Sequence, residues 1–295
     1  MRVHAFLLLL VGACGGGAAS VPGPFDLPIP PGPRATAAPM PAASSAAPSA
    51  SAAPSAPPLT ALPHEKIEVS AAIKAIVDAK DRTEDDRKLD AGRHPGELLA
   101  FLGIKPGMKV AELVAGGGYT SELLARAVGA KGKVYAENPK LILERFAEKP
   151  WSERLKRAAM KNVVRLDREL DDPFPAEVKD LDVVVMNLFY HDTFWMKTDR
   201  AKMNAAIFAA LKKGGVFVVI DHSGRAGTGS GEVESLHRID EKVVRDEVTA
   251  AGFKLVGDSE IFRNANDTRD WNASPRAAGE KRGTSDRFAL KFQKP

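Results

Sequence analysis

The chain has 295 residues, of which 44% are hydrophobic, and this length favours one large folded domain with extensions. Its formal net charge of +4 is small, and no dense stripe of Lys and Arg interleaved with aromatic residues is present, so we expect no nucleic-acid binding. A single cysteine excludes an intrachain disulfide and any metal site built from several thiolates.

The first residues have the pattern of an export signal. Arg2 precedes a short apolar run from Ala5 to Val11, which is too short to cross a bilayer as a helix. Val11 to Cys14 resembles the lipobox of bacterial lipoproteins, and the resemblance implies a signal peptide over 1–13 and acylation of Cys14. We therefore expect an exported protein held by its lipid on the cell envelope, at the outer membrane or the periplasmic face. The alternative is an ordinary cleaved signal in which Cys14 is incidental.

Residues 14–63 consist mainly of Pro, Ala, Ser and Gly and carry almost no charge. A segment of this composition buries too little apolar surface to fold, so we predict a disordered tether. The folded domain is expected over 64–295.

The domain begins with helical patterns. Apolar spacing predicts a helix over 68–80, Thr83 and Asp86 form a capping box that opens a second helix, and Pro95 begins a third. We expect the helical segment 64–103 to form a lid over a ligand. A solvated, salt-bridged surface is the alternative for its charged residues.

The chain is organised around the segment from Lys109 to Ala125. A short apolar run with Glu112 near its end is followed by Gly116–Gly118 and by an apolar-periodic segment from Tyr119 onward. This pattern predicts a buried strand, a glycine turn and a helix whose first N–H groups point at a ligand. Because glycine lets a ligand approach the backbone closely, we predict a site for a nucleoside-bearing cofactor. A plain tight connection is the alternative.

Further strands are predicted downstream, with helices between them. A helix marked by Met203 and Ile207 is expected to end at Gly214, before a strand that ends in Asp221 and His222. The other predicted strands cover 133–137, 163–166, 181–188, 253–256 and 288–292. The alternation of strands and helices predicts one doubly wound α/β domain.

The glycine segment resembles motif I of the class I S-adenosylmethionine-dependent methyltransferases. That motif has an acidic residue followed by glycines two, four and six positions on; after Glu112, Val114 replaces the first glycine, whereas Gly116 and Gly118 match. The stretches His237–Asp240 and Asp286–Phe288 resemble a family of predicted exported methyltransferases. The resemblance implies a Rossmann-like, mostly parallel seven-stranded sheet with an antiparallel C-terminal strand, and S-adenosylmethionine as cofactor.

The expected cofactor residues follow from position and from this resemblance. An acidic residue that ends the second strand of such a sheet binds ribose hydroxyls, which assigns that role to Glu137. The resemblance implies that Asp167 faces the adenine and that Asn187 belongs to a partial Asn-Pro-Pro-Tyr motif. The predicted cofactor-binding set is Glu112, Ala115, Gly116, Gly117, Gly118, Tyr119, Glu137, Asp167 and Asn187.

The predicted catalytic residues are His191, Asp192, His222 and His237. Imidazole titrates near neutrality, so a histidine at a strand end can act as a general base toward a methyl acceptor. For His191 the alternative is a helix cap. No set of metal ligands has a convincing spacing, although Asp221, His222 and His237 could meet in space.

Two other functions stay open at this stage. S-adenosylmethionine is made in the cytosol, whereas the N-terminal segment predicts export. The alternative function is therefore that of an inactive methyltransferase-fold lipoprotein that binds another ligand. An NAD(P)-linked oxidoreductase is disfavoured because Ser121 stands where the last glycine of Gly-x-Gly-x-x-Gly belongs. The methyl acceptor, a small molecule or an envelope component, is not specified by the sequence.

Overall fold

The structure is a computed structural model and describes residues 67–295. The predicted signal peptide, the lipidation site at Cys14 and the predicted tether lie outside the described residues. Within the described part of the chain, no helix combines the length and the apolar character needed to span a membrane.

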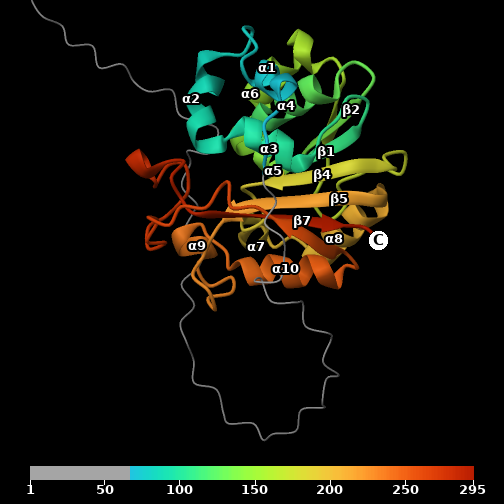
Figure 1. Cartoon of the computed structure of the whole chain (residues 1–295). Coiled ribbons are helices and arrows are strands. Elements are labelled where there is room, and N and C mark those ends of the chain that lie inside the picture. The colour runs from blue at the N-terminus through green and yellow to red at the C-terminus, as the bar shows by residue number, and fades with distance from the viewer. Residues whose placement is uncertain (1–66) are drawn as a thin grey trace, which may run out of the picture.

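Seven strands form one sheet in the order β3-β2-β1-β4-β5-β7-β6 (Figure 1). Their bounds are β1 (Lys109–Leu113), β2 (Lys133–Asn138), β3 (Val163–Asp167), β4 (Leu181–Asn187), β5 (Leu211–His222), β6 (Lys254–Asp258) and β7 (Arg287–Gln293). The pairs formed among β1 to β5 are parallel, and β7 is antiparallel to both of its neighbours. This confirms the predicted mostly parallel sheet with an antiparallel C-terminal strand. The strand order reverses between β1 and β4, and ligands of such sheets bind at the carboxyl ends of the strands beside that point.

The helices cover the sheet from two sides: α1 to α4 and α6 gather at the top of Figure 1, and α7 to α10 lie at the bottom. Their bounds are α1 (Ala71–Val77), α2 (Glu84–Arg93), α3 (Pro95–Leu102), α4 (Tyr119–Val128), α5 (Lys140–Ile142), η2 (Leu143–Ala147), α6 (Glu148–Leu155), η3 (Ala158–Met160), α7 (Asp192–Trp195), α8 (Arg200–Ala210), α9 (Val233–Leu236), α10 (Glu241–Ala250) and η4 (Gly279–Lys281).

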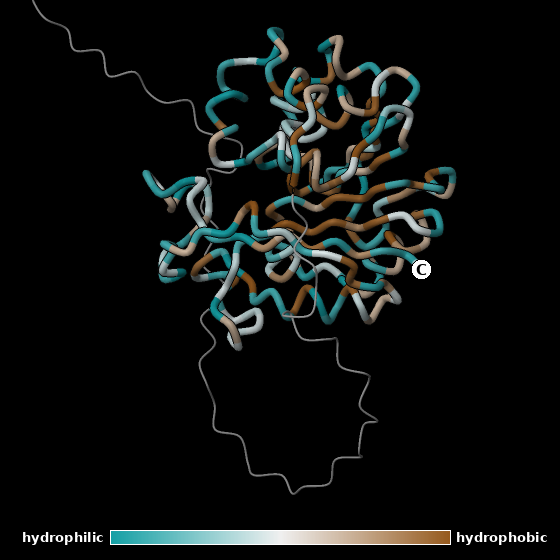
Figure 2. Tube along the Cα trace, viewed as in Figure 1, coloured by the Kyte–Doolittle hydropathy of each residue, from teal (hydrophilic) through white to brown (hydrophobic). Residues whose placement is uncertain are grey.

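The strands are apolar on both faces. In β4, Val184 and Met186 belong to a hydrophobic cluster that includes residues of α8 and α10, whereas Val183 and Val185 belong to one that includes residues of α3 and α4. Successive strand residues point to opposite faces, so a strand covered on both sides needs a continuous apolar run. Figure 2 shows this hydrophobic run along the central strands.

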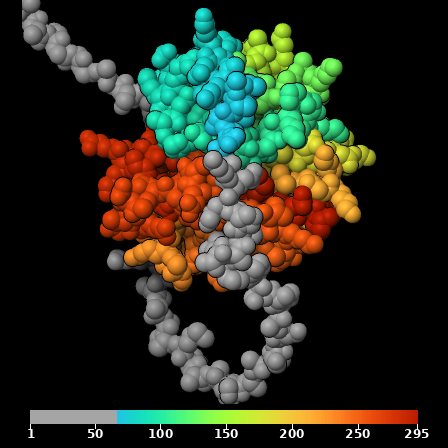
Figure 3. Space-filling model, in the orientation of Figure 1, coloured from blue at the N-terminus to red at the C-terminus, as the bar shows by residue number. Residues whose placement is uncertain are grey.

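The N-terminal helices pack firmly onto this body, as the adjoining blue-to-green and orange-to-red surfaces of Figure 3 show. The capping prediction is confirmed, because the Thr83 hydroxyl accepts a hydrogen bond from the Asp86 amide at 3.2 Å. Leu98 and Leu99 of α3 are fully buried in the cluster that includes α4 residues. This part of the predicted lid is therefore core.

The predicted end of the helix at Gly214 is wrong. Helix α8 ends at Ala210, and Leu211 already pairs with Leu181 of β4. The register of this pair shifts before Val183, so the intervening Lys-Lys-Gly-Gly forms an irregular start of β5. Gly214 has a φ of 77°, and its amide donates to the Lys294 carbonyl at 2.8 Å. The Gly-Gly pair therefore shapes the strand entry and does not end the helix.

Candidate functional site

The turn between β1 and α4 is a run of left-handed backbone. Gly116 and Gly118 have φ values of 57° and 80°, and Val114, at the position of the missing motif glycine, has a φ of 54°. A β-branched residue in this region stores about 1–3 kcal/mol of strain. A Cβ on Gly118 would lie 2.4 Å from the Trp151 ring, so glycine is required there by packing as well as by φ. The turn thus has the shape that the motif predicts, although one of its glycines is a valine.

The end of β2 holds this turn in place. The Val114 amide donates to Glu137 Oε2 at 3.1 Å, and the Ala115 amide donates to the Glu137 carbonyl at 2.8 Å. Asn138 pairs with Gly116 twice, accepting from its amide at 2.7 Å and donating to its carbonyl at 3.2 Å. The sequence analysis missed Asn138. Its only local signal is its position directly after the predicted strand-end acid.

Glu137 is fully buried, and its second carboxyl oxygen, Oε1, has no hydrogen-bond partner within the part of the chain that the structure describes. Burial raises the pKa of this carboxyl well above its ordinary value of 4.5, although the Val114 amide acts in the opposite direction. A buried acceptor without a donor is costly, by about 1–3 kcal/mol. Glu137 therefore faces the turn, as predicted, with one acceptor left for a ligand that donates hydrogen bonds.

Glu112, in contrast, is satisfied within the protein. Ser121, on the first turn of α4, donates its hydroxyl to Glu112 Oε2. Burial raises the pKa of Glu112 to about 7, although the bond from Ser121 opposes this shift. Glu112 lies beside the N-terminus of α4, where a negative charge is favoured. Ser121 thus has a local partner at the position where a dinucleotide-binding turn has glycine.

The rest of the turn is covered by side chains from the N-terminal helices and α6. Arg154 Nε donates to the Gly117 carbonyl at 2.6 Å, and the Tyr119 hydroxyl donates to Asp90 of α2 at 2.6 Å. The Arg93 guanidinium lies 4.5 Å from the centre of the Tyr119 ring. Gly117 is half-buried, whereas Ala115 and Tyr119 are buried. Side chains of α2, α4 and α6 therefore cover the turn, and the role of the helical segment as a lid stays a prediction.

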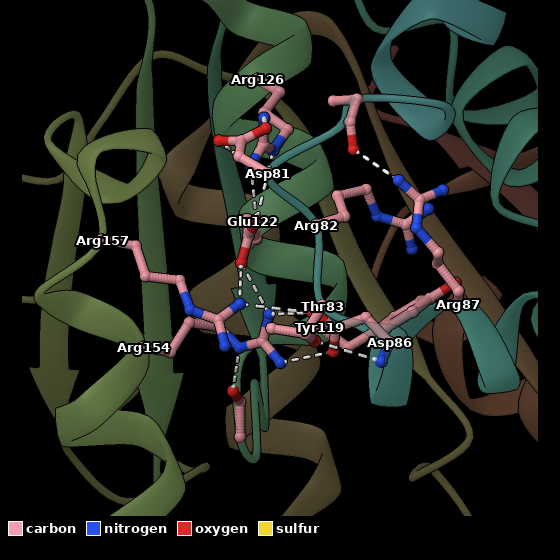
Figure 4. Close-up of polar contacts among 12 residues, drawn as sticks. Asp81, Arg82, Thr83, Asp86, Arg87, Tyr119, Glu122, Arg126, Arg154 and Arg157 are labelled. Carbon is pink, nitrogen blue, oxygen red and sulfur yellow. Dashed lines mark hydrogen bonds and ion pairs between the residues drawn. The ribbon is translucent and has the colours of Figure 1, made fainter.

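A network of ion pairs holds α2 against the side chains that cover the turn (Figure 4). Arg154 bridges Asp86 and Glu122 with contacts of 2.6 Å to each, and Arg157 contacts the same two carboxylates at 3.3 and 2.8 Å. Burial opposes ionisation of Asp86, but the hydrogen bonds and charge of Arg154 outweigh it and lower its pKa to about 2. The network joins three segments that are distant in sequence: α2, α4 and α6.

The two remaining predicted cofactor residues lie at neighbouring strand ends but are less enclosed. Asp167 is the last residue of β3, pairs in register with Asn138, and forms an ion pair with Arg165 at 2.7 Å. Its side chain is 47% exposed. Asn187 is the half-buried last residue of β4. Both therefore end strands at the carboxyl edge that carries Glu137.

The four predicted catalytic residues come together at the carboxyl ends of β4 and β5. The ring centres of His191 and His237 are 4.0 Å apart, and His222 lies 5.6 Å from His191 and 6.0 Å from His237. Asp192 Oδ1 lies 3.3 Å from His191 Nε2 and 3.5 Å from His237 Nδ1. We call His191, Asp192, Asp221, His222 and His237 the histidine cluster.

Asp221 orients the cluster from β5. Its carboxylate accepts from the His191 backbone amide at 2.7 Å, from His191 Nδ1 at 2.6 Å and from the His222 amide at 2.8 Å. A carboxylate only accepts, so Nδ1 of His191 carries the proton. His191 occupies the N-cap position of α7, as its alternative role expects, but its side chain makes no cap hydrogen bond there.

The three histidines differ in the direction in which the protein shifts their pKa values. Burial lowers the pKa of His191, but the adjacent carboxylates of Asp192 and Asp221 outweigh it and raise that pKa to about 10. Burial and the nearby His191 lower the pKa of His237 to about 4, and they lower that of His222 well below its ordinary value. The cluster therefore concentrates positive charge at His191.

The polar segment between β6 and β7 closes the cluster on another side. His222 Nδ1 and the Ser285 hydroxyl are 2.7 Å apart, and Arg238, next to His237, forms a fully buried ion pair with Asp267 at 2.8 Å. His237 itself has a φ of 56°. Neither the contact of Ser285 with His222 nor the ion pair of Arg238 with Asp267 is signalled by a local sequence pattern.

The fold is that of known methyltransferases. A SAM-dependent methyltransferase from Aquifex aeolicus matches at a TM-score of 0.51 and 19% identity, over 76% of this chain and 98% of that one. The [4+2]-cyclase SpnF matches at a TM-score of 0.50 and 15% identity, over 71% of this chain and 81% of that one. No protein-family model and no curated protein matches this sequence. Likeness at such low identity establishes the fold, and the reaction has to be argued from the site.

Proposed function

We propose that the chain is an S-adenosylmethionine-dependent methyltransferase. The observation that carries the proposal is Glu137: at the end of β2 it faces the glycine turn, fully buried, with Oε1 unpartnered. A ribose hydroxyl is a donor of the kind this acceptor lacks, and the strand-order reversal beside β1 is where such folds bind nucleotides. The Aquifex neighbour supports the same reading at the level of the fold.

In this proposal the cofactor supplies an activated methyl group, and the protein supplies position and proton handling. Glu137 binds the ribose, the turn from Ala115 to Gly118 approaches the methionine part, and Asp167 and Asn187 lie at the adjacent strand ends. The histidine cluster, at the same edge of the sheet, orients the acceptor and holds its proton. Because the turn is covered, α2 and Arg154 have to move for a ligand to enter.

Ligand-dependent stabilisation of the full-length chain tests this proposal. S-adenosylmethionine and S-adenosylhomocysteine at about 100 times their dissociation constants should each add about 2.7 kcal/mol to the free energy of unfolding, whereas NAD should add nothing. Glu137→Gln should weaken both ligands at least about tenfold, since it replaces the ribose acceptor with a donor. Glu177→Gln, in an exposed loop, is the matched control. Absence of any shift would refute the cofactor; an unchanged affinity in Glu137→Gln would refute the assigned geometry.

A second candidate is a ligand-binding protein that does not transfer methyl groups. Two observations favour it: the amides of Val114, Ala115, Gly116 and Gly118 already have partners within the chain, and SpnF is a cyclase on the same fold. Incubation with methyl-labelled S-adenosylmethionine and an envelope extract separates the two. Binding without label transfer supports this candidate, and label transfer that is lost in Glu137→Gln supports the enzyme.

For location, we propose export and lipid anchoring at Cys14. The support is the sequence alone: a short apolar core after Arg2 and a lipobox-like segment that ends at the single cysteine. The mature wild-type protein should fractionate with membranes and gain the mass of its acyl chains. Cys14→Ser should lose both properties; a membrane-bound, unacylated wild type would contradict the proposal.

A further inference from the structure

One atom of the histidine cluster lacks the partner that its burial demands. Asp221 accepts a hydrogen bond from Nδ1–H of His191, so Nε2 is the ring nitrogen left to bind something else, and this atom is buried without a hydrogen-bond partner among residues 67–295. Asp192 Oδ1 lies 3.3 Å from it and is an acceptor. A positive charge is needed between these two atoms, and either the second proton of a charged imidazole or a metal ion in its place can supply it.

We propose that His191, Asp192 and His237 bind a divalent transition-metal ion of the zinc class. The three side chains offer one donor atom each, and these atoms all lie within 4.8 Å of one another. This site goes beyond the proposed methyl transfer and does not depend on it, since its geometry involves no residue of the glycine turn.

The donor separations fit a metal better than they fit direct contacts. Zinc–nitrogen and zinc–oxygen bonds of about 2.0–2.1 Å in tetrahedral geometry place the donors about 3.3–3.4 Å apart. Asp192 Oδ1 lies 3.3 Å from His191 Nε2 and 3.5 Å from His237 Nδ1. The donor atoms of His191 and His237 lie within 4.8 Å of each other, so tetrahedral binding requires these two rings to approach to about 3.4 Å.

The surroundings of the three residues match those of metal ligands. Metal-binding histidines commonly donate their second ring N–H to a carboxylate, as His191 does to Asp221 at 2.6 Å. The ligating carboxylate is also oriented, because Trp195 Nε1 donates to Asp192 Oδ1 at 2.6 Å. Two imidazoles and one carboxylate suit zinc, iron or cobalt and are a poor set for magnesium.

The proposed metal site is partly exposed to solvent, and its three protein ligands leave a coordination position open. The His237 side chain is 15% exposed and that of Asp192 is 10% exposed, so an ion and a water molecule have an entry path. Three protein ligands leave at least one coordination position for water or substrate, and the His222 ring lies beside it. A metal here would act as a Lewis acid on an oxygen-bearing acceptor held at the ends of β4 and β5.

Metal titration of the full-length chain, purified without a histidine tag and stripped with chelator, tests the site. Calorimetry with Zn²⁺ should give one equivalent bound, Co²⁺ should give an absorption spectrum of nitrogen and oxygen ligands, and Mg²⁺ should not bind. His237→Asn and Asp192→Asn should each lower the Zn²⁺ affinity at least about 100-fold, which is about 2.7 kcal/mol. Asn tolerates the left-handed backbone of residue 237 and, at residue 192, keeps an acceptor for Trp195.

Two controls make the result specific. His94→Asn is the same substitution at another left-handed histidine, with a φ of 45°, and Cys14→Ser removes the single thiol; both should bind Zn²⁺ as the wild type does. Circular dichroism of the metal-free variants establishes that they fold, and either ligand variant alone is sufficient for the comparison. If the wild type binds no stoichiometric Zn²⁺, or if the folded ligand variants bind it as tightly as the wild type, the proposal is wrong.

Discussion

The glycine turn and the histidine cluster lie at the same edge of one sheet, but they differ in which buried polar atoms lack a hydrogen-bond partner. Among the described residues, the turn has a buried acceptor without a partner, Glu137 Oε1, next to the amides of Val114 and Gly116, which have partners, and a buried donor without one, Nε1 of Trp151. In the cluster the unpartnered atom is His191 Nε2, which faces a carboxylate oxygen. The first arrangement calls for a neutral donor such as a sugar hydroxyl, and the second calls for a cation. Unpartnered buried atoms therefore indicate the class of ligand at each place.

The two regions also differ in how they are enclosed. Trp151, Arg154 and Asp86 cover the turn, so substitutions there should mainly change stability. His237 is partly exposed and lies 3.5 Å from the Asp192 carboxylate, so its substitution should mainly change binding. Mutations whose effects on stability and on binding differ therefore test this difference between the two regions.

The largest effect is expected at Gly118. In Gly118→Ala the new methyl group would overlap the Trp151 ring in a left-handed backbone, and strain and overpacking together should cost about 3–4 kcal/mol of unfolding free energy. Gly117→Ala is the matched control, because its Cβ would lie 3.5 Å from Pro150, an ordinary contact. Chemical denaturation measures both. Equal losses would show that the turn is not closed by Trp151.

A smaller loss is expected for Asp86→Asn, which removes one carboxylate from the network and leaves Arg154 with Glu122 alone. Breaking a buried ion pair of this kind should cost about 2–3 kcal/mol. The folded pKa of Asp86, about 2, is below its ordinary value of 3.8, so its contribution is present above about pH 4 and is lost as the pH falls toward 2. Asp85→Asn, whose side chain is 90% exposed, is the control. An acid-unfolding midpoint that is unchanged in Asp86→Asn would contradict this account.

Glu137→Gln should stabilise the ligand-free chain while it weakens cofactor binding. Burial raises the pKa of Glu137, so the folded state loses stability as the pH rises above 4.5, where the unfolded chain releases this proton. Removing the ionisable group should raise the unfolding free energy by about 1 kcal/mol at pH 8 and by less at pH 5. Thermal unfolding at the two pH values measures the difference. A variant that is less stable than the wild type at pH 8 would show that the bond from the Val114 amide outweighs the cost of burying the ionised carboxylate.

The fold was predictable from two sequence signals. Buried parallel strands appear as continuous apolar runs, and a capping residue marks the beginning of a helix. The run from Leu181 to Leu188 predicted β4, and the Thr83 cap predicted α2. The error at Gly214 arose because a glycine after helical periodicity usually marks a helix end, whereas here the strand pairs with β4 from Leu211 onward. Strand pairing overrode the local signal.

The site was predictable where a residue's position in its strand decides its role, as it does for Glu137. Asn138 was missed because its partner, Gly116, is 22 residues away, and Arg154 was missed because it reaches Gly117 from 37 residues further along the chain. The meeting of His191 and His237 depends on the left-handed backbone at residue 237, which no periodicity reveals. Long-range contacts of polar side chains are the part that only a structure provides.

The smallest effect is expected where strain and burial offset each other, at Val114. Val114→Gly would release about 1–3 kcal/mol of left-handed strain and lose a similar amount from burial and chain entropy, so the net change should stay within about 1 kcal/mol. Val110→Gly, in the preceding strand β1 and with no positive φ, should cost about 3 kcal/mol, because nothing offsets the lost burial. Equal losses at the two positions would mean that Val114 is unstrained. A difference of this size would show that the turn keeps its shape against the preference of its own sequence, as a preformed ligand site does.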